Sequence, residues 1–97
     1  MEENIYLTKL FDYYGCLLTD KQQQYFTDYY MENLSITEIS ENNSVSRNAA
    51  YKQIKDAEKN LINYENKLHL EEKERKIKKL LNNISEKEIK EEILDLI

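Results

Sequence analysis

The chain has 97 residues, of which 34% are charged and 40% hydrophobic, and it carries a net charge of −5 at neutral pH. A chain of this length and composition is typical of one globular domain with a modest core. The apolar runs are too short for a transmembrane helix, and the N-terminus is acidic where a secretory signal would be basic. We therefore expect a cytoplasmic protein without membrane insertion.

An all-α fold is predicted because the sequence has no proline and a single glycine. Three capping boxes begin helices, since a Ser or Thr and a Glu or Gln three residues later can bond otherwise unpaired backbone N–H groups. The boxes lie at 19–22, 35–38 and 85–88, and Ser46 is a fourth predicted N-cap. The resulting helices span roughly 4–17, 20–32, 36–42 and 46–69, and a last one follows Ser85.

Tyrosines recur at helical spacing in the first two predicted helices. Tyr6, Tyr13 and Tyr14 share a face of the first helix, while Tyr25 and Tyr29 lie one turn apart in the second. We interpret these rings as core and interface filling with a polar tip. Stacking on nucleic-acid bases is the alternative.

Residues 34–61, LSITEISENNSVSRNAAYKQIKDAEKNL, have the layout of a helix-turn-helix. This motif needs a short support helix, a tight turn and a second helix with polar side chains near its start. Residues 35–42 are the predicted support helix, residues 43–45 the turn, and Ser46 the cap of the recognition helix. The turn has Ser44 where glycine is usual.

Six side chains near the start of the recognition helix form the candidate nucleic-acid interface: Ser46, Arg47, Asn48, Tyr51, Lys52 and Lys55. Arginine and asparagine can make bidentate contacts with guanine and adenine, whereas lysine and tyrosine suit phosphate. The alternative is a solvated helix face, because the chain is acidic overall and Asp56, Glu58 and Glu65 dilute the positive charge.

The segments LLTDKQ, LSITEIS, VSRNA and YENKLHL together resemble the YlxM family of small bacterial helix-turn-helix proteins, over roughly residues 7–70. The family is similar in turn to the C-terminal DNA-binding domain of bacterial sigma factors. The resemblance implies an all-α fold. It also implies a regulatory role in the signal recognition particle pathway, because the family's genes commonly lie beside those of the particle. If the family reads DNA, the positions that match here are Ser46, Arg47, Asn48, Tyr51 and Lys52.

A heptad seam runs along the recognition helix, with apolar residues separated by 4, 3, 4, 3 and 4 positions: Ala50, Ile54, Ala57, Leu61, Tyr64 and Leu68. Such a seam is either an intramolecular ridge or a dimer interface. We expect a homodimer interface, because a helix this long outruns a core made by three short helices.

Residues 1–70 are the predicted helix-turn-helix domain, with about four helices. Residues 71–97 are a charged helical C-terminal extension that is not an independent domain. Their basic run between Lys73 and Lys79 has Glu71, Glu72 and Glu74 at helical offsets, which is typical of a solvated face; contact with RNA or phosphate is the alternative.

No catalytic set, phosphate-binding glycine loop or metal-ligand cluster is present in the sequence, and Cys16 and His69 stand alone. We therefore expect no cofactor, no metal and no enzymatic activity. The leading hypothesis is a dimeric helix-turn-helix regulatory protein that binds DNA or RNA and acts with signal recognition particle components. The alternative is a protein–protein adaptor that keeps the fold without reading nucleic acid.

Overall fold

The computed structural model describes residues 2–97, which are helical apart from short turns and loops and form no strand. The elements, in chain order, are α1 (Glu2–Tyr14), the 3-10 turn η1 (Gly15–Leu17), α2 (Asp20–Phe26), the π-helical turn η2 (Thr27–Met31), α3 (Ile36–Asn42), α4 (Arg47–Leu68), α5 (Leu70–Leu81) and α6 (Lys87–Asp95). The predicted all-α fold class is confirmed.

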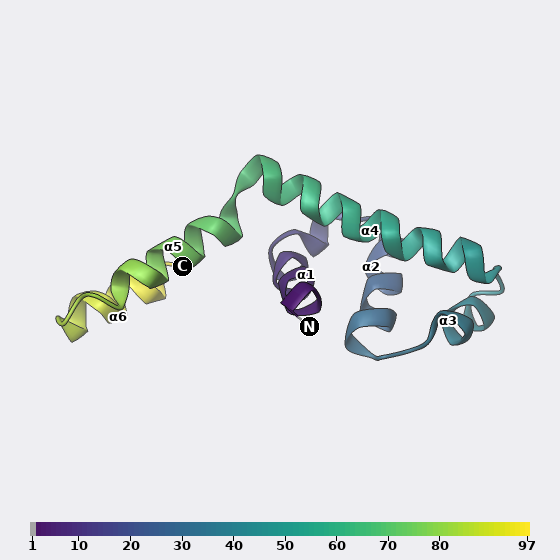
Figure 1. The fold of residues 1–97 in the computed structure, drawn as a ribbon, viewed down its shortest axis with the longest axis horizontal. Coiled ribbons are helices and arrows are strands. Elements are labelled where there is room, and N and C mark those ends of the chain that lie inside the picture. The colour runs from purple at the N-terminus through teal and green to yellow at the C-terminus, as the bar shows by residue number, and fades with distance from the viewer. Residues whose placement is uncertain (1) are drawn as a thin grey trace.

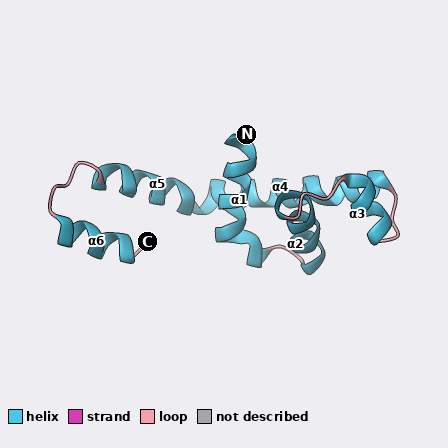
Figure 2. Cartoon of the chain, turned by 90° about the horizontal axis from the view of Figure 1, so that it is seen from below, coloured by secondary structure: helices cyan, strands magenta, loops and turns pink. Residues whose placement is uncertain are grey.

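The long helix α4 is the spine of the molecule. Helices α1, α2 and α3 all pack against it, and Figure 1 shows them on one side of it. From the end of α4 the chain turns into α5, which leads away from this body, and α6 then runs back toward it (Figure 2). The molecule is therefore elongated, 55 × 25 × 21 Å.

Three of the four predicted helix caps are confirmed. Thr19 and Ser35 each form both hydrogen bonds of a capping box, and Ser46 accepts a bond from the N–H of Ala49 at 3.0 Å. The box predicted at Ser85 is wrong. Helix α6 begins at Lys87 with Glu86 as its N-cap, one residue later than this box requires, and no side chain caps its first turn.

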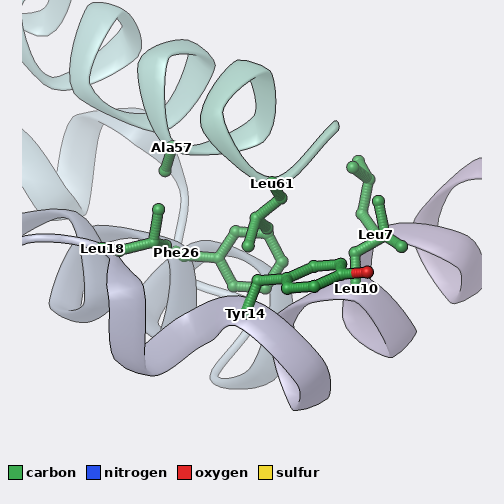
Figure 3. Close-up of a cluster of buried hydrophobic side chains, with 7 residues drawn as sticks. All are labelled: Leu7, Leu10, Tyr14, Leu18, Phe26, Ala57 and Leu61. Carbon is green, nitrogen blue, oxygen red and sulfur yellow. The ribbon is translucent and has the colours of Figure 1, made fainter. Parts of the chain in front are cut away.

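Two clusters of buried side chains form the core, and α4 contributes to both. The larger lies between α1, α2 and the middle of α4 (Figure 3): Leu7, Leu10, Tyr14, Leu18, Phe26, Ala57 and Leu61. The smaller joins α2, α3 and the start of α4: Tyr25, Ile39, Ala50 and Ile54. Because the second cluster is the interior of the helix-turn-helix, one continuous helix fixes that motif to the rest of the body.

Most of the heptad seam belongs to this core. The side chains of Ala50, Ile54, Ala57 and Leu61 are at most 1% exposed, because α1, α2 and α3 of the same chain cover them. These four residues therefore offer no surface to a second copy, which corrects their assignment to a dimer interface. Tyr64 is partly buried, and Leu68, 46% exposed, is the one seam residue fully at the surface. The homodimer itself stays a prediction.

A buried polar network sets the angle between α4 and α5. His69 adopts a left-handed conformation, with φ 57°, and ends α4. The Glu65 carboxylate then accepts bonds from the backbone N–H groups of Glu71 and Glu72, both at 3.1 Å. The Tyr14 hydroxyl donates to Glu65 Oε1 at 2.6 Å and accepts from the N–H of Leu70 at 3.1 Å. Side chains from α1 and α4 thus accept hydrogen bonds from the backbone N–H groups at the start of α5, which have no partner within that helix.

Candidate nucleic-acid interface

Helices α3 and α4 form the helix-turn-helix, and the turn between them closes without glycine. Ser44 takes the left-handed conformation, with φ 54°, that glycine usually occupies. The backbone N–H of Val45 donates to Ser40 O at 3.0 Å, and the Asn43 side-chain amide donates to Ile39 O at 2.8 Å. These bonds satisfy carbonyls at the end of α3 and offset the cost of a left-handed serine.

All six candidate residues at the start of α4 are exposed. Ser46 has a second role, since its hydroxyl oxygen caps the helix. Arg47, Asn48 and Tyr51, together with Ile36 of α3, line a shallow hollow of about 280 Å³ between the starts of the two helices. The structure therefore brings three of the predicted residues together around one concave surface.

Lys52 and Lys55 extend the same face but are already paired with acids of α4. Lys52 Nζ lies 2.9 Å from Asp56 Oδ2, and Lys55 Nζ lies 3.2 Å from Glu58 Oε1. The charge of Lys55 is retained: burial alone would lower its pKa, but the hydrogen bond and the charge of Glu58 outweigh burial and raise it. The neighbouring acids partly cancel the positive field of this face.

Glu58 and Glu65 do more than dilute the positive face, because both are buried acceptors for tyrosine hydroxyls. Glu58 is 7% exposed and accepts a bond from Tyr30, as Glu65 does from Tyr14. Burial and the bond to Glu58 raise the pKa of Tyr30. The sequence held one signal for this role: the two acids are seven residues apart, each directly after a seam position.

The arrangement is suited to contact with a groove of nucleic acid. A recognition helix presents the side chains of its first turns to base edges. Arg47 and Asn48 occupy the first turn of α4, and neither takes part in an ion pair or side-chain hydrogen bond among the described residues. Their polar groups are therefore available to a ligand.

The described residues contain no group of three or more His, Cys, Asp or Glu side chains that could hold a metal ion. Among them, no helix has both the length and the apolar character needed to cross a membrane.

Comparisons with known proteins agree with the motif. A family model described as "UPF0122: Putative helix-turn-helix protein, YlxM / p13 like" matches residues 1–97. A UPF0122 protein of Clostridium acetobutylicum is 45% identical over 87 residues, 90% of this chain and 75% of that relative. A UPF0122 protein of Mycoplasma capricolum is 42% identical over 91 residues, 94% of this chain and 80% of that relative.

A UPF0122 protein of Bacillus cereus is 41% identical over 102 aligned positions, which cover 100% of this chain and 93% of that relative. The match therefore extends through α5 and α6 as well as the helix-turn-helix. The chain belongs to the UPF0122 family of YlxM/p13-like helix-turn-helix proteins.

Proposed function

We propose that this chain is a non-enzymatic regulatory protein that binds nucleic acid through the first half of α4. The observation that carries the proposal is the exposed set Arg47, Asn48 and Tyr51, gathered around the hollow at the start of the helix-turn-helix. The buried cluster between α2, α3 and α4 holds this surface in place. An arginine and an asparagine on a fixed helix can each read a base edge, which gives about 1–3 kcal/mol of discrimination per good bidentate contact.

The proposed setting is the signal recognition particle pathway. Its support is the resemblance to the YlxM family, whose genes commonly lie beside those of the particle. The candidate ligands are thus duplex DNA near those genes and the RNA of the particle itself.

The test measures binding of DNA duplexes and of the particle's RNA by fluorescence anisotropy, at about 50 and about 200 mM salt. We expect Arg47→Ala/Asn48→Ala to weaken binding by about tenfold to a hundredfold. The matched control is Asn66→Ala/Lys67→Ala, which removes one amide and one charge from two exposed residues in the last turn of the same helix. Equal loss in both variants, or none in the first, contradicts the proposal.

A protein–protein adaptor is the second candidate, and the ion pairs of Lys52 and Lys55 favour it. Both lysines are paired with acids. Of the three basic residues on this face, Arg47 alone forms no ion pair among the described residues. Electrostatic attraction to phosphate is then weak. Binding to a protein component of the particle that is equally strong in the wild type and in Arg47→Ala/Asn48→Ala would support the adaptor.

A further inference from the structure

The last two helices form an arm, residues 70–97, whose start is held by hydrogen bonds to Tyr14 and Glu65 but which has little apolar contact with the body. Neither core cluster contains a residue of the arm, and Leu81 is its one buried apolar side chain. A hollow of about 620 Å³ lies between α1 and α5, and seven of its ten lining residues are charged. The arm therefore has little apolar packing against the body.

Large apolar side chains of the arm are instead exposed to solvent. Leu80 is 67% exposed and Leu96 is 83% exposed, and Ile89, Leu94 and Ile97 are exposed as well. A nine-residue helix such as α6 is marginal in water unless it buries a face against a partner. These apolar side chains stay exposed although the two helices are neighbours in the chain. The arm therefore lacks a surface against which to bury them.

The two helices of the arm carry opposite charge. Helix α5 has five basic and three acidic residues, whereas α6 has four acidic and two basic ones. Among the described residues, every ion pair of the arm joins two residues close in sequence, and none connects α5 with α6. Lys76 is paired with Glu72 of its own helix at 2.9 Å, but among the described residues the bases of α5 are not paired with the acids of α6.

On each helix the exposed charges and apolar side chains share a stripe. On α5, Lys73, Lys76 and Leu80 are spaced three and four residues apart, and Ile89 and Glu92 of α6 with its C-cap Leu96 follow the same spacing. Residues at this spacing lie on one helix face. All six are exposed. One stripe is apolar and basic, and the other is apolar and acidic.

We propose that the arm docks a second copy of this chain. The stripe of α5 in one copy packs on the stripe of α6 in the other. Under two-fold symmetry the same contact forms twice, because an isologous interface repeats every pair. Each contact joins opposite charges and covers exposed leucine and isoleucine, while pairing α5 with α5 or α6 with α6 would bring like charges together.

The test is charge reversal followed by mixing, read by sedimentation velocity at tens of micromolar protein. Two variants are made: Lys73→Glu/Lys76→Glu, with α5 reversed, and Glu88→Lys/Glu92→Lys, with α6 reversed. The wild type is expected to be a dimer. Each variant alone is expected to dimerise about a hundredfold more weakly, because both copies of the contact turn from attraction to repulsion. An equal mixture of the two variants restores both attractions and should restore the dimer.

The control is Lys21→Glu/Lys67→Glu, which reverses two exposed bases outside the arm and should leave dimerisation unchanged. Far-UV circular dichroism verifies that each variant keeps its helix content. A monomeric wild type, reversed variants that dimerise as the wild type does, or a mixture that stays monomeric would each overturn the proposal. Nucleic acid is absent from this experiment, so its outcome is independent of the proposed nucleic-acid binding.

Discussion

The hydroxyl of Tyr14 connects α1 to the junction between α4 and α5, and its removal tests how that junction is held. Tyr14 is 1% exposed; its hydroxyl donates to Glu65 at 2.6 Å and accepts from the N–H of Leu70 at 3.1 Å. Tyr14→Phe leaves the ring in the core but leaves both partners with one bond fewer in a buried site. The fold should survive, with a weaker attachment of α5.

The expected loss of stability follows from these two bonds. A hydrogen bond to a charged acceptor contributes about 1.5–3 kcal/mol, and a neutral one about 0.5–1.5 kcal/mol. Tyr14→Phe should therefore lower the free energy of unfolding by about 2–4 kcal/mol. This is a large share of the free energy of unfolding of a small domain, which is roughly 5–15 kcal/mol in total.

Urea denaturation measures the loss, and amide hydrogen exchange locates it. Exchange should accelerate most at the amides of 70–72, which the Tyr14 and Glu65 side chains cover. The control is Tyr6→Phe, a partly exposed tyrosine of the same helix, which should change stability by less than about 0.5 kcal/mol. The reasoning is refuted if Tyr14→Phe costs no more than Tyr6→Phe, or if exchange rises equally throughout the chain.

Two further predictions concern pH and the helix-turn-helix turn. Burial and the hydrogen bond to Glu65 raise the pKa of Tyr14 from 10.0 to about 12. The protonated phenol therefore stabilises the fold fully below pH 10, and this contribution is lost as the pH rises through about 12. Urea titrations across this pH range should show that the free energy of unfolding falls less steeply in Tyr14→Phe than in the wild type. Identical profiles for the two proteins would contradict the assignment of this pH dependence to Tyr14. Ser44→Gly should raise the thermal midpoint, with a gain of up to about 1 kcal/mol, because glycine adopts the left-handed conformation without strain; a lower midpoint would show that the serine is not strained.

The sequence alone predicted the helix starts and the helix-turn-helix layout well. The caps at Thr19, Ser35 and Ser46 were readable because a capping hydroxyl bonds an amide only three residues away. The exposed face at the start of α4 was readable for a similar reason, since helical spacing assigns neighbouring side chains to one side. The box at Ser85 was mispredicted because the same local pattern occurs where the helix starts one residue later.

The local chemistry of the chain thus determines the class of fold, most helix boundaries and the side chains that are exposed at the start of α4. Only the tertiary structure decided what covers the heptad seam, because a period of 3.5 residues states that a face is apolar but not which helix lies on it. It also decided that Glu65 is a buried cap for α5. That role depends on Tyr14, which lies 51 residues earlier in the chain and reaches the carboxylate only after α1 has packed on α4.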